Sequence, residues 1–128
     1  MAQPDPAYFR LPPGGATECG ENDMQAFRLD ELDADRHAKD VAYLEFLRER
    51  TMSAGLYGLD VLGTDPQGPH TEDEVYIVLS GRATITVGSE TAEVVHGSVV
   101  YVPAGVTHRF HNISEDLRVV AVFTPPES

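Results

Sequence analysis

The sequence is poor in cysteine and in basic residues, and it has no long hydrophobic run. It contains one cysteine, Cys19, which forms no internal disulfide and is expected to be a free thiol in a loop. Nine basic residues against 21 acidic ones give a formal net charge of −12, which argues against a nucleic-acid ligand and against an anionic membrane surface. No apolar run reaches the ~20 residues of a membrane span, and the N-terminus lacks the basic-then-apolar pattern of a signal peptide. These features together predict a cytoplasmic protein.

The length and the overall composition favour one folded domain. The chain has 128 residues, of which 41% are hydrophobic and 23% charged, an ordinary balance for a globular protein. A chain of this size buries roughly two-thirds of the surface that its unfolded form exposes, so we expect a substantial core.

The N-terminal part of the sequence predicts an arm followed by a helix. Residues 1–32 begin with a stretch rich in Pro, Gly and polar groups, which indicates a loosely docked arm. Over residues 33–50 the apolar side chains recur at helical spacing, so that Val41, Leu44 and Leu47 line one stripe. We therefore expect one helix over residues 33–50, packed on the remainder of the chain.

Residues 51–128 predict a β domain. Short runs rich in Val, Ile, Tyr and Phe alternate there with turns that contain Gly and Pro. Roughly seven short strands at regular spacing are typical of an all-β sandwich or barrel, and not of alternating strands and helices.

One predicted strand, residues 74–80, is apolar on both of its faces. Successive side chains of a strand point to opposite faces, and a sheet with one face in solvent would alternate between apolar and polar residues. The outer face of this strand is therefore expected to be covered, either by the helix or by a second subunit. The second possibility predicts a homodimer.

Residues 97–112, GSVVYVPAGVTHRFHN, predict a strand, a tight turn and a return strand. Pro103 ends the first strand, and Gly105 supplies the positive φ that a type II turn requires at its third position. His108 and Phe110 then share one face of the return strand. This arrangement holds an imidazole at a fixed point on an otherwise apolar inner face.

A second segment, PHTEDEVYIVLSG at residues 69–81, contributes two more polar side chains. His70 precedes Glu74 by four residues, and Glu74 opens a strand. On a barrel wall these side chains are able to converge with His108 across the interior. Two imidazoles and one carboxylate form a set that binds a divalent transition metal and leaves coordination positions open for water or substrate.

These two segments resemble the motifs of the cupin family. The second cupin motif, G-x(5)-P-x-G-x(2)-H-x(3)-N, is matched at every fixed position, by Gly97, Pro103, Gly105, His108 and Asn112. The resemblance covers about residues 52–124 and implies an all-β double-stranded β-helix, which is a small jelly-roll barrel.

The first cupin motif, G-x(5)-H-x-H-x(3,4)-E-x(6)-G, is matched only in part. Glu74 and Gly81 have the required separation, and His70 falls at the second histidine position. Gly68 stands at the first histidine position, and the leading Gly63 is one residue closer than the motif asks.

The resemblance implies that His70, Glu74 and His108 hold a divalent transition metal, either Fe, Mn, Ni or Zn. Many cupins use four protein ligands, so Gly68 at the first histidine position leaves three outcomes open. The metal is held by three side chains plus water, or Gln67 adds a fourth ligand through its amide oxygen, or the site has lost its metal.

Aromatic side chains are expected to line the barrel around the metal, namely Tyr57, Tyr76, Tyr101 and Phe110. A tyrosine hydroxyl there is able to donate a hydrogen bond to a bound substrate, although core packing is the simpler role for each ring. A small apolar cavity with one metal suits a small oxygenated or carboxylated molecule.

Four other polar residues are not assigned to the metal. Glu72 has the strand parity of the two ligands near it, but a loop carboxylate is more often solvated. His111 is out of parity with His108, and His37 lies in the predicted helix, so both are expected to be solvated or paired. Asn112 is expected to stabilise a turn.

The resemblance implies an oxygenase- or lyase-type enzyme, in which the metal polarises a substrate oxygen or O2. The alternative is a non-catalytic ligand-binding or sensing module with a degraded metal site, because Gly68 leaves that site short of one histidine. A third hypothesis, a metal-free epimerase-like cupin, needs basic residues for phosphates and is disfavoured by their scarcity. No catalytic residue is assigned.

Overall fold

The structure is a computed structural model that describes residues 8–10, 23–66 and 68–128. The described residues contain seven strands and one helix. Cys19 and Gln67 lie outside the described residues. The elements are, in chain order, β1 (Tyr8–Arg10), α1 (Leu29–Ala38), β2 (Tyr43–Arg48), β3 (Ser53–Leu59), β4 (Asp73–Val87), β5 (Glu90–Val95), β6 (Val99–Val102) and β7 (His108–Thr124).

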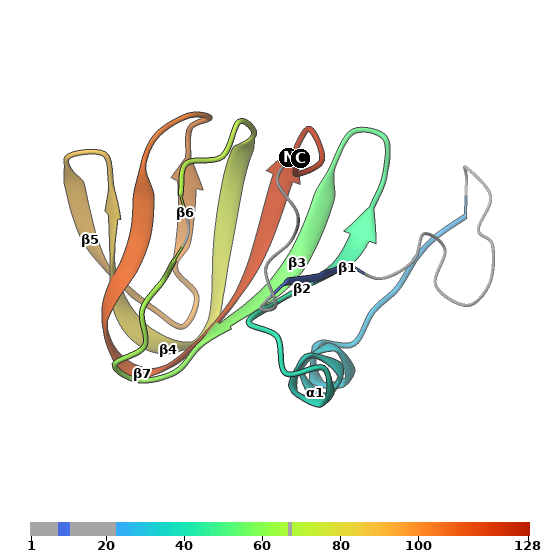
Figure 1. Cartoon of the computed structure of the whole chain (residues 1–128), viewed down its shortest axis with the longest axis horizontal. Coiled ribbons are helices and arrows are strands. Elements are labelled where there is room, and N and C mark those ends of the chain that lie inside the picture. Colours follow the sequence, from blue (N-terminus) through green and yellow to red (C-terminus); the bar gives the residue numbers. More distant parts are fainter. Residues whose placement is uncertain (1–7, 11–22, 67) are drawn as a thin grey trace.

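The strands form one curved sheet in the order β1-β2-β3-β7-β4-β5, with β6 paired to β4 (Figure 1). β7 pairs with β4 along almost its whole length, whereas β6 and β5 pair with successive halves of the other edge of β4. Figure 1 shows β5 at one end of this sheet and β2 and β3 at the other, with the long strands β4 and β7 bending between them. The predicted all-β fold with a single helix is confirmed.

β4 and β7 are long, at 15 and 17 residues, where the sequence predicted short strands. Their pairing continues through three register shifts, so each strand bends without ending. At Gly81, where φ is 97°, a Cβ atom would lie 2.3 Å from the carbonyl oxygen of Asp116 on β7. Asn112 marks the break in β7, with a φ of 51°, and the alternation shifts there so that Phe110 and Ile113 are both buried.

The predicted helix over residues 33–50 is wrong in its second half. The helix ends at Ala38, and residues 43–48 form β2, which pairs with β1 and β3. The chain leaves the helix through Asp40, which adopts a φ of 52°. The N–H groups of this residue and the next one donate to carbonyls of the last helical turn, at 3.0 and 3.3 Å, which is the Schellman pattern of a helix C-terminus.

The apolar residues between Val41 and Leu47 fit two periodicities. Their three- and four-residue spacing suits a helix, but the same stretch also alternates as a strand does. In the structure Tyr43 packs into the barrel interior and Leu44 packs on the outer side of the sheet. The hydrogen bonds to the neighbouring strands decide between the two periodicities, and they come from distant parts of the chain.

The buried apolar side chains form two clusters on opposite sides of the sheet. The inner cluster fills the barrel, and its largest fully buried members are Tyr76, Phe110 and Phe123. The outer cluster contains Leu32 of α1 together with Leu44 of β2 and Leu56 of β3, with Phe9 of β1 among its partly buried members. α1 therefore covers the outer face of the sheet over β2 and β3.

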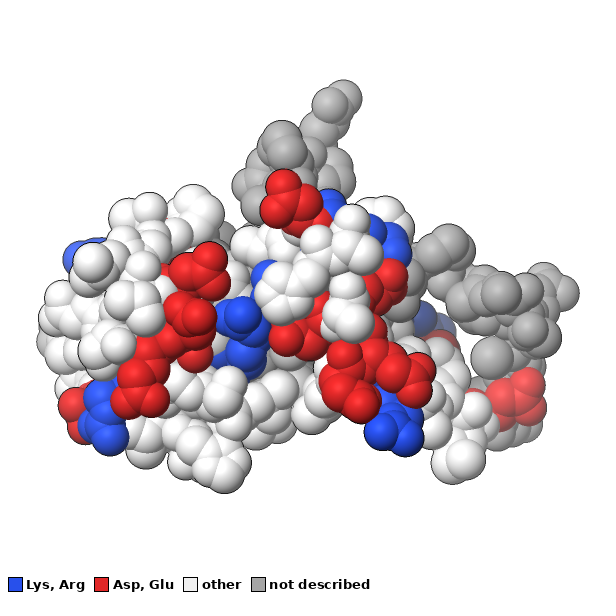
Figure 2. Space-filling model, turned by 90° about the horizontal axis from the view of Figure 1, so that it is seen from below, with Lys and Arg blue, Asp and Glu red and all other residues white. Residues whose placement is uncertain are grey.

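The described surface carries many carboxylates with basic side chains among them. Figure 2 shows Asp and Glu side chains spread over the face seen from below, with Lys and Arg interleaved. Ion pairs of this kind join Arg82 to Glu93 at 2.9 Å and to Glu115 at 3.5 Å. Among the described residues, no helix has the length and apolarity that crossing a membrane requires.

Candidate metal centre

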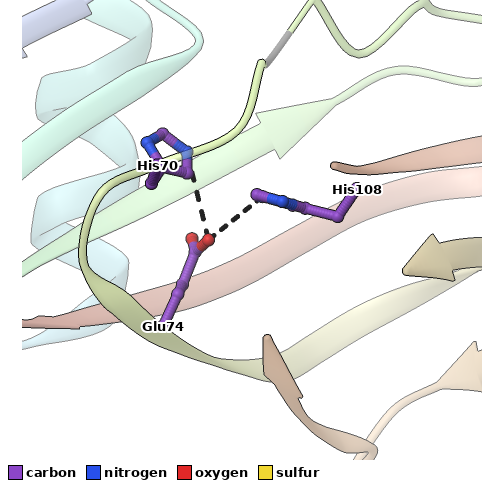
Figure 3. Close-up of side chains that lie close together, drawn as sticks. All are labelled: His70, Glu74 and His108. Carbon is purple, nitrogen blue, oxygen red and sulfur yellow. Dashed lines mark ion pairs between the residues drawn. The ribbon is translucent and has the colours of Figure 1, made fainter. Parts of the chain in front are cut away.

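His70, Glu74 and His108 converge inside the barrel (Figure 3). His70 lies in the loop before β4, Glu74 is the second residue of β4, and His108 is the first residue of β7. The Nε2 atom of His108 lies 3.1 Å from Oε1 of Glu74, and Nε2 of His70 lies 4.0 Å from the same oxygen. One possible ligand atom from each residue lies within 4.8 Å of the other two. The structure thus brings together the three residues that the sequence selected.

The turn between β6 and β7 sets the position of both histidines. Gly105 adopts the expected positive φ, 79°, and its N–H donates to the carbonyl oxygen of His70 at 2.7 Å. The N–H of Val106 donates to the carbonyl oxygen of Pro103 at 3.3 Å, which closes the turn. The turn therefore starts the strand of His108 and also holds the backbone of His70.

The orientation of the His108 ring follows from its contact with Val106. Nδ1 of His108 lies 3.0 Å from the carbonyl oxygen of Val106. A carbonyl oxygen only accepts hydrogen bonds, so Nδ1 carries the proton and Nε2 presents its lone pair to Glu74. Metal-bound histidines in proteins are held in the same way, through a hydrogen bond from the nitrogen that does not bind the metal.

The atoms at the centre of the cluster are buried and lack hydrogen bonds. Glu74 is 1% exposed and His108 2% exposed. Both carboxylate oxygens of Glu74 and Nε2 of His108 have no hydrogen-bond partner among the described residues, and the two side chains lie 3.1 Å apart as an ion pair. A buried carboxylate without hydrogen bonds costs several kcal/mol unless a cation or a proton compensates its charge.

The environment shifts the two histidine pKa values in opposite directions. Burial lowers the pKa of His70, against the opposing attraction of the Glu74 carboxylate. Burial also acts to lower the pKa of His108, but the Glu74 carboxylate and the Val106 carbonyl outweigh it and leave that pKa raised. Glu74 is therefore the group that favours positive charge at this point of the barrel.

The three residues fit a divalent transition metal. Adjacent ligands of one ion lie about 3 Å apart when each is about 2.1 Å from it, and the His108–Glu74 pair already has that spacing. Two neutral imidazole nitrogens and one carboxylate oxygen are the donor types of a facial triad. His70, at 4.0 Å from the same oxygen, stands farther away.

Aromatic rings surround the cluster on the inner side of the barrel. The ring centroid of Tyr76 lies 6.0 Å from that of His108 and 4.8 Å from that of Phe110. Phe123 meets the ring of His70 edge-on at 5.0 Å. These contacts give the site an apolar wall, as the sequence predicted for Tyr76 and Phe110.

Tyr57 and Tyr101 differ in their relation to this wall. Tyr57 is buried, and its hydroxyl donates to Oδ1 of Asp65 at 2.6 Å. The prediction that Tyr101 lines the same wall is wrong, because Tyr101 points outward, is 58% exposed and bonds Asp73 at 3.1 Å. Its neighbour Val102 takes the inward position on β6.

The other polar residues lie as follows. Gln67, the possible fourth ligand, lies outside the described residues. Glu72 is 5% exposed, against the expectation that it is solvated, and it bonds the hydroxyl of Thr71 and the N–H of Ser128. His111 pairs with the hydroxyl of a neighbouring strand residue at 2.7 Å, and His37 contacts an arginine of its own helix at 3.2 Å.

No local sequence pattern marks two further carboxylates that lie near the centre. Asp65 accepts from the Tyr57 hydroxyl and from the backbone N–H of Phe110 at 2.9 Å, so it ties the loop after β3 to the barrel wall. Glu127, next to the last residue of the chain, lies 3.3 Å from Nδ1 of His70. Neither has a characteristic spacing from the ligands, and only the folded chain places them there.

The chain belongs to the cupin family. The Cupin_2 family model, described as a cupin domain, matches residues 56–123. This range contains all three residues of the cluster. The resemblance read from the two motifs is confirmed.

Similar proteins are found both by sequence and by structure, and the structures share the fold. The chain is 70% identical to an uncharacterised protein of Streptomyces coelicolor over 105 residues, which cover 82% of this chain and 100% of that protein. A Bacillus halodurans structure is 19% identical and has a TM-score of 0.69, covering 84% of this chain and 86% of its own. An RmlC-like cupin family protein from Methanocaldococcus jannaschii, with a double-stranded β-helix fold, is 20% identical with a TM-score of 0.60, covering 65% and 78%. The fold is the double-stranded β-helix that the resemblance implied.

Proposed function

We propose that this chain is a metal-binding cupin in which His70, Glu74 and His108 hold one divalent transition metal. The observation that carries the proposal is the set of buried atoms without hydrogen bonds, which are both oxygens of Glu74 and Nε2 of His108. A metal ion accepts lone pairs from two imidazoles and a carboxylate at once, and its charge offsets that of the carboxylate. The same atoms without a metal form a costly arrangement.

The donor set defines the chemistry that the metal supplies. Fe, Mn, Ni and Zn all bind imidazole and carboxylate ligands. Three protein ligands leave positions for water or for an oxygen atom of the substrate, and the bound metal acts there as a Lewis acid. We propose an oxygenase- or lyase-type reaction on a small oxygenated or carboxylated molecule.

The residues of the chain have separate roles in this proposal. Glu74 supplies the negative charge, and the Val106 carbonyl accepts the Nδ1 proton of His108, so that the neutral ring has its lone pair on Nε2. The rings of Tyr76 and Phe110 exclude water beside His108 and favour a substrate with a small apolar part.

A non-catalytic ligand-binding module is the second candidate. The observation that favours it is Gly68, which stands where the first cupin motif has a histidine, so that the described donor set contains three residues. A chain of this kind would bind the same small molecules and release them unchanged.

Metal content is the direct test. Protein purified without a metal-affinity step is analysed by elemental mass spectrometry, and we expect about one equivalent of transition metal per chain. His108→Ala removes a ligand and lowers the content several-fold. His111→Ala removes a histidine that pairs with Thr86 instead, and it keeps the metal.

Two results together contradict the proposal. The purified protein contains less than about a tenth of an equivalent of transition metal per chain, and added Fe, Mn, Ni or Zn does not raise its melting temperature. A metal that binds the folded state would raise the melting temperature. If metal is present, small carboxylated compounds that raise the melting temperature are incubated with the protein. Conversion of one of them supports the enzyme, and binding without conversion supports the module.

A further inference from the structure

The C-terminal end of the chain returns to the metal centre and is anchored there by its backbone. The N–H of Glu127 donates to Oγ of Ser53 at 2.9 Å, and Ser53 is fully buried. Nη1 of Arg48 donates to the carbonyl oxygen of Glu127 at 2.9 Å and also to Oε1 of the buried Glu45 at 3.1 Å. Glu127 itself is 9% exposed. Its place is therefore set by β2 and β3.

The side chain of Glu127 contacts His70 from the side opposite to Glu74. Oε2 of Glu127 lies 3.3 Å from Nδ1 of His70, whereas Nε2 of the same ring faces Oε1 of Glu74 at 4.0 Å. The two nitrogens of one imidazole thus face two different carboxylates. Glu127 is not part of the group whose ligand atoms lie within 4.8 Å of one another.

In both histidines of the centre Nδ1 lies beside an acceptor oxygen, but the oxygen belongs to a different kind of group in each. His108 lies on a strand, and its Nδ1 contacts the carbonyl oxygen of Val106 two residues away. His70 lies in a loop, so its ring has no strand to set its direction. Phe123 contacts the ring edge-on, and Glu127 supplies the acceptor beside Nδ1.

We propose that Glu127 is a positioning residue for the metal centre: its carboxylate accepts the Nδ1 proton of His70 and keeps the Nε2 lone pair directed at the metal position. The inference rests on the proposed function, since it assigns a role in holding a metal ligand. A carboxylate in this place orients the ring and makes its other nitrogen a better donor to a cation. Glu127 is then part of the site.

The first test needs no metal. NMR of the imidazole nitrogens in metal-free protein, at a pH where the ring is neutral, reports which nitrogen of His70 carries the proton. We expect the Nδ1–H form in the wild type and a mixture with the Nε2–H form in Glu127→Ala. The matched control is Glu90→Ala, which removes the same charge from the exposed start of β5, and His111 serves as an unaffected internal reference.

The second test measures affinity for Zn²⁺ by competition with a chelator of known affinity. Glu127→Ala is expected to weaken binding about 10- to 100-fold, the usual effect of losing an outer partner of a metal-bound histidine. Glu127→Gln keeps an acceptor oxygen and recovers part of the affinity, and Glu90→Ala binds as the wild type does. The melting temperature of each metal-free variant shows whether it is folded.

The two tests separate this inference from the proposed function. A wild-type protein that binds no metal overturns the proposed metal site. The tautomer of His70 in that protein still shows whether Glu127 accepts the Nδ1 proton. An unchanged His70 tautomer in Glu127→Ala, or Zn²⁺ affinity equal to that of the wild type, overturns the role of Glu127. If Glu127→Ala does not fold, Glu127→Gln decides: a Zn²⁺ affinity below that of Glu90→Ala together with a changed His70 tautomer supports the inference, and wild-type values of both overturn it.

Discussion

At the scale of single residues, Glu74 shows how the site opposes the stability of the barrel. Its carboxylate is 1% exposed, and neither oxygen accepts a hydrogen bond. The pKa of His108 is raised by this carboxylate, so the pair stabilises the fold below the unfolded pKa of histidine, and that contribution is lost as the pH rises through the folded pKa. Above that pH the metal-free barrel contains a buried negative charge opposite a neutral ring.

We therefore expect Glu74→Gln to stabilise the metal-free protein at alkaline pH. The gain is on the order of 1 kcal/mol, because the amide loses the charge but still lacks hydrogen-bond partners. The gain should shrink as the pH falls through the raised pKa of His108, where the wild type recovers its ion pair. Urea unfolding of chelator-treated protein at several pH values measures this effect.

Two comparisons complete that prediction. Glu90→Gln removes a charge from an exposed position and should change the free energy of unfolding by less than about 0.5 kcal/mol. A loss of stability in Glu74→Gln at every pH would show that the carboxylate already has a favourable partner in the metal-free barrel.

At the scale of elements, the fold depends on β4 and β7 remaining paired through their bends. Gly81 and Gly97 have similar positive φ values, 97° and 91°. They differ in their surroundings, because a Cβ at Gly81 would lie 2.3 Å from the carbonyl oxygen of Asp116, whereas nothing lies within 4 Å of a Cβ at Gly97. Substituting each of the two glycines by alanine therefore distinguishes the cost of backbone strain from the cost of disturbing the close packing of β4 and β7.

Gly97→Ala should cost about 1–2 kcal/mol of stability from the unfavourable φ alone. Gly81→Ala should cost a further 1–3 kcal/mol or so, since β7 has to move away from β4 to admit the methyl group. Chemical denaturation of both variants gives the difference. Equal losses would mean that the two strands separate at this bend without cost.

At the scale of the whole molecule, the outer face of the sheet is covered unevenly. α1 covers it over β2 and β3, where the outer cluster lies. On β4 and β6 the paired residues Ile77 and Val99 remain 38% and 67% exposed, and Tyr101 beside them is 58% exposed. The helix therefore does not cover this part of the strand that the sequence showed to be apolar on both faces.

The homodimer is the remaining way to cover that face, and we expect it to form there. Val99→Asp places a charge on the exposed apolar patch and should convert a dimer into a monomer. Light scattering of the wild type and the variant gives the masses. Leu62→Asp, which alters an equally apolar side chain 88% exposed in the loop after β3, should leave the dimer intact. A wild type with the mass of one chain would contradict the prediction.

The sequence alone determined the features that depend on local spacing. The turn with Gly105, the separation of His70 from Glu74 and the inward face of His108 were all readable, because period-two strands and turn geometry act over a few residues. These are the residues that the structure brings together. The family and the all-β architecture followed from the same segments.

Only the tertiary structure decided the features that depend on distant partners. Residues 43–48 are a strand because β1 and β3 lie on either side of them, although their spacing also suits a helix. Tyr101 faces outward because the pleat of β6 is set by its pairing with β4. Glu127 reaches His70 because Ser53 and Arg48 hold its backbone. These residues are far apart in the sequence, so no local spacing predicts the contact.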